Sequence, residues 1–389
     1  MKKTLAAVAV LGAFAGSALA ADVQLYGIID TGVRYLHSDM DVGYGGGVAK
    51  DVDANDTFSM ESGMQSGSRW GFKGTEDLGN GLTVGFILED GFASDTGAEK
   101  DQMFDRESSL FLEGGFGKFA MGRMGSINGG VSSWGKHGVM SAFGTSWGSY
   151  AAQADTVFGG SGKWDNMIAY ETPSFAGFKV FAQYGMGSDS NENESSSDRY
   201  YALGASYTNG PLSLYLAVDS INYKTAGVSN ADDIDDSLTV RFGGNYDFEV
   251  AQIFAGAAYF DEARIGSFSG AASDWFDAIN IAGYVSDDFK VKGWSLGVSG
   301  AIPAAGGKIL VGAGYMNAEA ADSMTEANWS DVEIDRWIIS AGYDYPLSKR
   351  TDVYGVVTYN QDSLDNLDSG NYSADASVYG VMVGLRHKF

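Results

Sequence analysis

The last thirteen residues of the chain, Ser377–Phe389, read SVYGVMVGLRHKF and decide the fold. Their large apolar members share one parity, and these are Tyr379, Val381, Val383, Leu385 and Phe389. The positions between them include Gly380, Gly384, Arg386 and Lys388. Alternation with a period of two residues predicts a β-strand with one apolar face and one polar face. Because a free strand edge exposes unpaired N–H and C=O groups, we expect the first strand to pair with this one and close a barrel.

The first twenty residues have the parts of an export signal. Lys2 and Lys3 supply positive charge, an apolar stretch follows, and Ala18-Leu19-Ala20 is a small-x-small cleavage site. We therefore expect residues 1–20 to be a cleaved signal peptide and residues 21–389 to form one domain. The mature chain has no apolar run of about 18 residues, which a spanning helix requires. An exported chain that ends in an aromatic strand residue is typical of outer-membrane barrels.

The composition favours a large sheet. The chain contains 55 glycines and 4 prolines, and aromatic residues make up 13% of it, too many for a disordered protein. It has no cysteine, so it is not a disulfide-stapled secreted domain. Without Lys2 and Lys3 it carries 23 basic and 50 acidic residues, an excess of 27 negative charges. Such a surface excludes electrostatic binding to nucleic acid or to anionic membranes.

The same alternation recurs along the whole mature chain. In the first expected strand, Leu25 and Val33 face one way, and Asp30 and Arg34 face the other. An even number of strands is typical of bacterial single-chain barrels. The sixteen expected strands are Asp22–Tyr35, Ser66–Thr75, Leu82–Phe92, Asp105–Gly114, Gly117–Arg123, Trp164–Glu171, Phe178–Met186, Arg199–Tyr207, Leu212–Tyr223, Leu238–Tyr246, Val250–Phe260, Trp294–Ile302, Ile309–Asn317, Arg336–Tyr345, Asp352–Asn360 and Ser377–Phe389.

Short and long connections alternate between these strands. The short turns include Glu76–Gly81, Thr208–Gly210 and Pro346–Lys349. The long polar connections are His37–Gln65, Met124–Lys163, Gly187–Asp198, Lys224–Ser237, Asp261–Lys292, Ala318–Asp335 and Gln361–Ala376. Outer-membrane barrels place short turns in the periplasm and long loops outside. The sequence therefore predicts an all-β fold, a 16-stranded antiparallel transmembrane β-barrel with short periplasmic turns and long extracellular loops.

A secreted sandwich or propeller is the competing interpretation, because it also has many short alternating strands. The regular change of connection length and the terminal Phe389 argue against it. The expected strand Trp294–Ile302 carries Ser295 and Ser299 on the face opposite Trp294. A soluble core would be apolar on the inside, whereas small polar residues suit a water-filled lumen.

Specific stretches resemble the general trimeric porins of Gram-negative bacteria, in particular those of β-proteobacteria. They are spread over the mature chain and include VQLYGIIDTGV near the start, SRWGFKGTEDLGNGLTVGFILEDGF at Ser68–Phe92, GKFAMGR at Gly117–Arg123, YETPSFAGFKVFAQY at Tyr170–Tyr184, YPLSKRTDVY at Tyr345–Tyr354 and GLRHKF at Gly384–Phe389. The resemblance implies a 16-stranded barrel, a homotrimer, and a third loop folded into the lumen as a constriction.

The connection Met124–Lys163 suits such an inward loop, and it is the third on its side of the barrel when residues 93–104 are counted after His37–Gln65. It is long and weakly charged, and it contains Trp134, Trp147, Tyr150 and Phe158 with one acidic residue, Asp155. A solvated outer loop of this length would normally carry more charge. A mobile surface loop, or one that grips a neighbouring subunit, is the alternative. We expect the loop to pack against the lumen wall.

The wall opposite this loop should carry the charges that select ions. Arg34 and Arg69 have lumen parity, and Arg123 matches the family's constriction arginine through its place in GKFAMGR. The parity of Arg123 points outward, where an arginine at mid-bilayer costs roughly 2–4 kcal/mol, so we expect a bulge or the strand end to turn it inward. With Asp155 these arginines form the expected constriction. Secondary pore-lining candidates are Asp30, Glu89, Arg106, Glu107 and Arg241. A purely structural role, with arginines paired to these acids, is the alternative for each.

Acidic clusters in the long connections raise the question of metal binding. The run from Asp51 to Asp56 lacks the glycine and the final glutamate of an EF-hand, so that motif is rejected. The favoured interpretation is a solvated outer face. The sharper hypothesis is that Ca²⁺ or Mg²⁺ bridges loop carboxylates to lipopolysaccharide phosphates, and its candidates are Asp51, Asp53, Asp232 and Asp233. No other cofactor is expected.

The sequence offers no assembled catalytic motif. It has no cysteine nucleophile, no nucleophile elbow and no phosphate loop, and His37, His137 and His387 lie far apart. We therefore expect a non-enzymatic pore in the outer membrane for passive diffusion of ions and small hydrophilic solutes. The alternatives are a channel selective for one anion or sugar and, with less support, a barrel enzyme. The expected partners are two further copies of the chain, outer-membrane lipid and lipopolysaccharide, and the barrel-assembly machinery, which would recognise Phe389. A modest anion preference is expected at the constriction.

Overall fold

The computed structural model describes residues 22–44, 50–148, 151–187, 197–223, 235–268, 289–324, 331–367 and 372–389. For residues 44, 50–54 and 372 the description covers the backbone only. The described chain forms one antiparallel sheet of 17 strands. The strands are β1 (Gln24–Tyr44), β2 (Lys50–Ser62), β3 (Arg69–Gly79), β4 (Leu82–Gly91), β5 (Glu107–Gly114), β6 (Gly117–Gly125), β7 (Lys163–Glu171), β8 (Phe178–Gly185), β9 (Arg199–Asn209), β10 (Leu212–Asn222), β11 (Leu238–Asp247), β12 (Gln252–Arg264), β13 (Lys290–Ala304), β14 (Gly307–Ala320), β15 (Glu333–Pro346), β16 (Thr351–Asn366) and β17 (Tyr372–Lys388).

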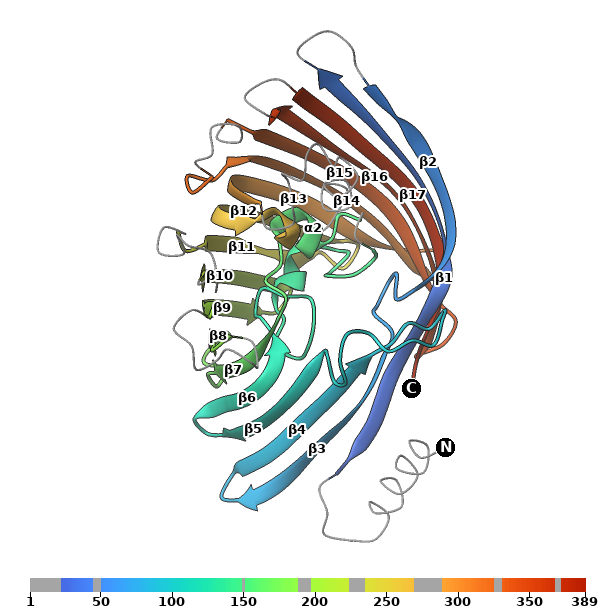
Figure 1. The fold of residues 1–389 in the computed structure, drawn as a ribbon. Coiled ribbons are helices and arrows are strands. Elements are labelled where there is room, and N and C mark those ends of the chain that lie inside the picture. The colour runs from blue at the N-terminus through green and yellow to red at the C-terminus, as the bar shows by residue number, and fades with distance from the viewer. Residues whose placement is uncertain are drawn as a thin grey trace.

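The sheet closes on itself through its first and last strands (Figure 1). β1 pairs with β17 from Ile28 opposite Lys388 to Tyr44 opposite Tyr372. Its other edge pairs with β3 up to Ile28 and with β2 from Thr31 onward, so β2 and β3 lie end to end as one stave. The 17 strands therefore make a barrel of 16 staves, which confirms the predicted fold.

The two faces of the wall have the predicted chemistry. On β17, Val381 and Val383 point outward and are exposed, whereas Val378 and Met382 point inward and are buried. The turn between β3 and β4 is as tight as the sequence indicates, because Asn80 and Gly81 have φ values of 54° and 74°. The long-range pairing of each strand with its neighbours satisfies the backbone polar groups, as hydrocarbon surroundings demand. Among the described residues, no helix is long and apolar enough to cross a membrane.

The strands extend further than the alternation predicts, and most of all in the first long connection. The expected loop His37–Gln65 is wrong as a loop: β1 continues to Tyr44 and β2 returns from Lys50. β12 to β17 also reach into the expected loops, for example to Asn366 in β16. Strand pairing continues there although the polar pattern is lost. Beyond the hydrocarbon layer the outer face meets water, so a pattern based on lipid contact no longer marks the strand.

The connection between β6 and β7 folds into the barrel, and we call residues 126–162 the third loop. It carries a 3₁₀-helix, η2 (His137–Met140), and a short helix, α2 (Ala154–Phe158), which lies within the ring of strands (Figure 1). Trp134, Phe143 and Trp147 are buried, and Tyr150 lies outside the described residues. The inward position predicted from the loop's low charge and aromatic content is confirmed.

Candidate pore constriction

Glycines on one side of the wall form a trough that receives the third loop. A Cβ atom at Gly256 of β12 would lie 2.5 Å from Met140 Cε, and one at Gly314 of β14 would lie 2.6 Å from Val157 Cγ2. A Cβ atom at Gly297 of β13 would lie 2.8 Å from Phe158 Cζ. Because these distances are far below normal contact, only glycine lets the large apolar side chains of the loop lie against the sheet. The loop is therefore held by close packing on β12–β14.

Polar contacts along the trough fix the register of the loop. The backbone N–H of Ala142 donates to Ser299 Oγ at 2.8 Å, and that of Ala152 donates to Ser340 Oγ at 2.9 Å. Arg241 Nε donates to the carbonyl oxygens of Phe158 and Gly159 at 3.0 and 3.1 Å. Small hydroxyl residues on the lumen face thus serve as hydrogen-bond partners for loop backbone that is removed from water.

Arg241 was expected to line the pore, and the structure corrects this. Its side chain is only 2% exposed, and its Nη1 atom lies 2.9 Å from Asp219 Oδ1. The pair lies beneath the end of α2, where it holds the loop instead of facing the channel. Arg336 and Asp362 form a second buried pair, 2.7 Å apart, that the sequence analysis did not single out. Parity places both arginines on the lumen face, but it gives no information about what covers them.

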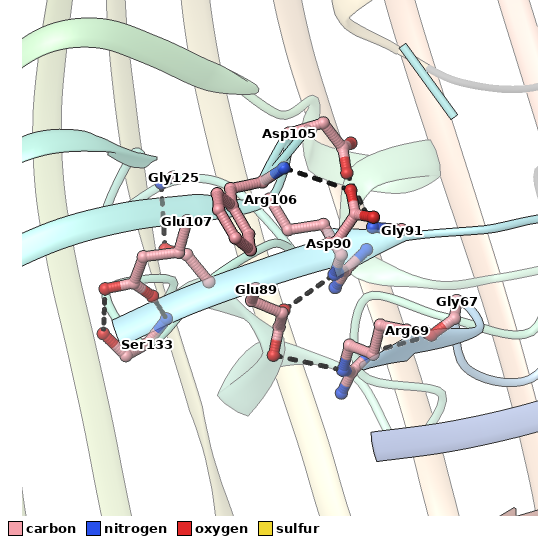
Figure 2. Close-up of polar contacts among 12 residues, drawn as sticks. Gly67, Arg69, Glu89, Asp90, Gly91, Asp105, Arg106, Glu107, Gly125 and Ser133 are labelled. Carbon is pink, nitrogen blue, oxygen red and sulfur yellow. Dashed lines mark hydrogen bonds and ion pairs between the residues drawn. The ribbon is translucent and has the colours of Figure 1, made fainter. Parts of the chain in front are cut away.

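Glu107, at the start of β5, binds the first part of the third loop on the side of the barrel away from β12–β14. Its carboxylate accepts hydrogen bonds from the N–H of Ser133 at 2.8 Å and from Ser133 Oγ at 3.0 Å (Figure 2). Glu107 as a whole is 1% exposed. Glu107 therefore hydrogen-bonds to the loop and is buried beneath it. It does not line the channel, contrary to the expected role. A sequence pattern shows neither the serine partner nor its position in space.

Arg69 and Arg106 share one carboxylate on the uncovered wall. Arg106 Nε lies 2.7 Å from Glu89 Oε1, and Arg69 Nε lies 3.5 Å from Glu89 Oε2 (Figure 2). Tyr26 Oη also donates to Glu89 at 3.0 Å. Two guanidinium groups against one carboxylate leave a net positive charge at this position. The predicted residues Arg69, Glu89 and Arg106 thus come together from β3, β4 and the start of β5.

Two other expected charges of the wall, Arg34 and Asp30, lie apart from Glu89. Arg34 Nη2 lies 2.7 Å from Glu61 Oε1, with side chains that are 25% and 30% exposed. Asp30 is fully buried, and it accepts from the N–H groups of Gln65 and Ser66 and from Tyr354 Oη. Asp30 therefore stabilises the bend between β2 and β3 and does not face the channel, which corrects the expected pore-lining role.

Arg386 is a wall cation that the sequence analysis did not select. Its Nη2 atom lies 2.9 Å from Asp352 Oδ2, and its Nη1 donates to Ser66 Oγ at 2.9 Å. The polar parity of the terminal strand was the available signal, because it places Arg386 opposite the outward Val383 and Leu385. Phe389 closes the same seam: its N–H donates to Gly27 O at 3.0 Å and its C=O accepts from Gly27 N at 3.1 Å.

Arg123 lies at the end of β6, where the pairing with β7 shifts. The register changes between Gly122 and Met124, and Gly122 has φ of 133°. This is the irregularity expected from the awkward parity. Arg123 Nε donates to the carbonyl of Asp105 at 2.7 Å, and Nη1 forms an ion pair with Asp165. The guanidinium group is thus held at the end of β6 and is not within 4.0 Å of Glu89, the carboxylate shared by Arg69 and Arg106.

The charges of the third loop are few. Asp155 Oδ1 lies 2.6 Å from Nε2 of the buried His137, so the acid expected to face the arginines is occupied within the loop. Lys136 Nζ lies 3.7 Å from Glu171 Oε2. Burial lowers the pKa of the Lys136 ammonium, and the charge of Glu171 opposes that effect. A neutral imidazole does not cancel the charge of a carboxylate, so Asp155, whose side chain is 25% exposed, is the one acidic group that the loop places against the basic wall.

The four expected metal-binding carboxylates lie outside the side chains that the structure describes. Asp232 and Asp233 lie outside the described residues, and Asp51 and Asp53 are described only as backbone of β2. Within the described part, no group of three or more carboxylates, histidines or cysteines could hold a metal ion.

Comparisons with known proteins agree with this architecture. The sequence matches the family model of the Gram-negative porins over residues 6–366. An outer membrane porin protein of Bordetella pertussis is 32% identical, and outer membrane porin protein 32 of Delftia acidovorans is 30% identical, each over 100% of both chains. The solved structure of an anion-selective porin from Comamonas acidovorans has a TM-score of 0.63 and 23% identity, and the match covers 95% of this chain and 100% of that one. At this identity the structural likeness concerns the fold.

Proposed function

This chain belongs to the Gram-negative porin family, and we propose that its pore passes small anions modestly better than cations. The protein is an outer-membrane porin, a water-filled channel through which ions and small hydrophilic solutes diffuse passively. The barrel supplies a wall with paired backbone groups, and the third loop occupies part of the lumen. The preference between ions then depends on the charges that remain accessible beside the loop.

The unequal burial of acids and bases on the wall supports an anion preference. The carboxylates of Asp30 and Glu107 are consumed by backbone and serine donors, and Glu89 is shared by two arginines. The side chains of Arg34 and Glu61 are similarly exposed, at 25% and 30%, so this pair adds little net charge. The side chain of Arg69 is 24% exposed and that of Glu89 only 11%, so the accessible charge around Glu89 is more positive than negative. The Comamonas acidovorans porin, which is described as anion-selective, offers a parallel for this proposal.

The acidic outer loops oppose this preference from a greater distance. The mature chain has an excess of 27 negative charges, and the long connections hold many of them. Their field is screened within about 8–10 Å at ordinary salt, whereas charges at a narrow wall act on the ion directly. We expect a Cl⁻/K⁺ permeability ratio of about 2–5, equivalent to about 0.4–1 kcal/mol, which falls at low salt as the acidic mouth is less screened.

The zero-current potential across a KCl gradient tests this proposal. In planar bilayers, Arg34→Ala, Arg69→Ala and Arg123→Ala should each lower the Cl⁻/K⁺ ratio, and Arg69 should have a larger effect than Arg123, which is paired with Asp165. Arg350→Ala, in the exposed turn before β16, is the matched control. Cation preference of the native pore at high salt, or equal ratios in all variants, would reject the proposed anion-selective ring.

We further propose that the barrel is a homotrimer whose assembly depends on Phe389. Two observations support this proposal. The apolar outer face of β17 ends at Phe389, and the backbone of Phe389 forms two hydrogen bonds with Gly27 across the seam between β1 and β17. Deletion of Phe389 should lower the yield of heat-modifiable trimer in the outer membrane, whereas Lys388→Gln, beside it, should leave the yield intact. Equal trimer yields for the deletion and the native chain would contradict this role.

The proposal includes lipopolysaccharide and the barrel-assembly machinery as partners, and it includes no catalysed reaction and no cofactor. Divalent cations could act only through the outer carboxylates, with Asp51, Asp53, Asp232 and Asp233 as candidates. Chelation with EDTA should then lower the thermal stability of lipopolysaccharide-bound protein. Substitution of the four acids by asparagine or serine should remove this response. A response that persists in the substituted protein assigns the cations to lipopolysaccharide alone.

A further inference from the structure

A hollow of about 150 Å³ lies on the wall near the short-turn end of β3–β6. Lys73 and Lys118 line it, with Ile87 and Phe111 between them. Lys73 precedes the tight turn at Asn80-Gly81, and Lys118 follows the turn between β5 and β6. The hollow is therefore at the opposite end of these strands from the long connections.

The hollow faces the lumen. Lys73 has the same parity on β3 as Arg69, whose side chain meets Glu89. The ammonium group of Lys118 lies 5.2 Å from the ring centroid of Trp134, which belongs to the third loop inside the barrel. A solute that passes the third loop thus meets these two side chains.

Both ammonium groups lie against aromatic rings instead of carboxylates. Lys73 Nζ is 5.1 Å from the ring centroid of Tyr26, and Lys118 Nζ is 4.2 Å from that of Phe111. In the part of the chain that the structure describes, neither lysine has a carboxylate oxygen within 4.0 Å. Asp22 also lines the hollow without forming such a pair. A cation–π contact leaves the N–H donors of an ammonium group available for an acceptor.

The surroundings of the hollow are also basic. Lys136 and Lys179 share the single carboxylate of Glu171, and the charge of Lys118 acts on Lys136. Glu113 lies opposite Lys118 on β5, so the four ammonium groups of Lys73, Lys118, Lys136 and Lys179 are accompanied by three carboxylates, Glu171, Asp22 and Glu113. The excess positive charge favours an anion, and the apolar floor of Ile87 and Phe111 favours a nonpolar group attached to it.

We propose that this hollow, formed around Lys73 and Lys118, is a binding subsite for small carboxylates with a compact apolar body. A cavity of about 150 Å³ is the size that accommodates a benzene ring in protein interiors, so a benzoate-sized anion fits. The carboxylate is placed between the two ammonium groups, and the ring lies on Ile87 and Phe111. The inference rests on the pore function but not on the sign of its preference between Cl⁻ and K⁺.

Benzoate block of chloride current through reconstituted native channels tests the subsite. Benzoate added on the short-turn side should block saturably with half-effect at millimolar concentration. Lys73→Gln and Lys118→Gln should each raise that concentration about fivefold, equivalent to about 1 kcal/mol. Lys349→Gln, in an exposed turn far along the chain, is the matched control. Acetate, which has the charge alone, and benzyl alcohol, which has the ring alone, should block much more weakly.

Phe111→Leu separates the apolar floor from the lysines, since it should weaken benzoate block and leave the response to acetate unchanged. The Cl⁻/K⁺ ratio measured without benzoate reports on the proposed ion preference, so failure of one proposal is distinguishable from failure of the other. Absence of saturable block, or equal half-effect concentrations in the native protein and both lysine variants, would overturn the subsite. Equal block by acetate would overturn its apolar part.

Discussion

The two sides of the lumen wall use their residues in opposite ways. On β12–β14, glycines remove side chains so that Met140, Val157 and Phe158 of the third loop lie directly on the sheet. On β3, β4 and the start of β5 the charged side chains remain, and Arg69 and Arg106 converge on Glu89 (Figure 2). We expect the covered side to determine the size of the aperture by packing and the uncovered side to determine its charge. A substitution could then change the ion preference and leave the loop in place, or change the loop and leave the ion preference intact.

Among the changes that distinguish the two sides of the wall, removal of the third loop should have the largest effect on single-channel conductance. If residues 139–158 are replaced by a short glycine–serine link, single-channel conductance should rise by about twofold or more, because the aperture widens. Larger sugars should also enter in liposome swelling. Shortening the connection 188–196 between β8 and β9 is the control and should leave both unchanged. Equal conductance for the loop-shortened and native pores would show that the loop does not narrow the lumen.

Filling the glycine trough should have a smaller effect of the same kind. Gly314→Leu places new atoms where Val157 lies, and overpacking typically costs about 1–3 kcal/mol. We expect the loop to detach part of the time, which would appear as a higher and noisier single-channel conductance. Gly115→Leu is the control, because a Cβ atom there has no other heavy atom within 4 Å. Native-like conductance and noise for Gly314→Leu would mean that the trough does not position the loop.

Loss of Glu89 tests the uncovered side alone. Glu89→Gln frees two guanidinium groups from their shared carboxylate, so the Cl⁻/K⁺ ratio should rise by about two- to fourfold, as expected for one charge roughly 10 Å from the ion path in water. Glu249→Gln, an exposed acid in the turn between β11 and β12, is the control. The conductance of both variants should stay within the native range. A fall in the ratio for Glu89→Gln would show that Arg69 and Arg106 do not face the ions.

The sequence predicts the barrel well because the residues of each strand alternate between the lipid-facing and the lumen-facing side. Alternation in segments such as Ser377–Phe389 reflects lipid on one side and lumen on the other, and needs no long-range information. The inward loop is likewise visible in its own composition, with low charge and several aromatic residues. The extension of β1 and β2 is not visible, because water wets both faces there and the alternation ends.

The site is less predictable because its charges depend on partners that are distant in sequence. Arg34 and Arg241 have the same lumen parity, yet one retains solvent contact and the other is buried beneath α2. Glu107 is removed from the channel by Ser133, 26 residues away. Burial beneath a loop is decided by the path of that loop, and no local pattern in β5 or β11 encodes it. Parity therefore finds the lumen face, and only the fold separates lining residues from loop anchors.

We propose that the basic pair on the uncovered wall, Arg69 and Arg106, gives the pore its preference between anions and cations. The most direct measurement is the zero-current potential of the double variant Arg69→Gln/Arg106→Gln across a KCl gradient, with Arg350→Gln as the control for loss of charge outside the lumen. Removal of both charges should change the Cl⁻/K⁺ ratio by about four- to sixteenfold, enough to turn a modest anion preference into a cation preference. The control should keep the native sign. A double variant that still prefers anions to the native extent would contradict the assignment of ion preference to this wall.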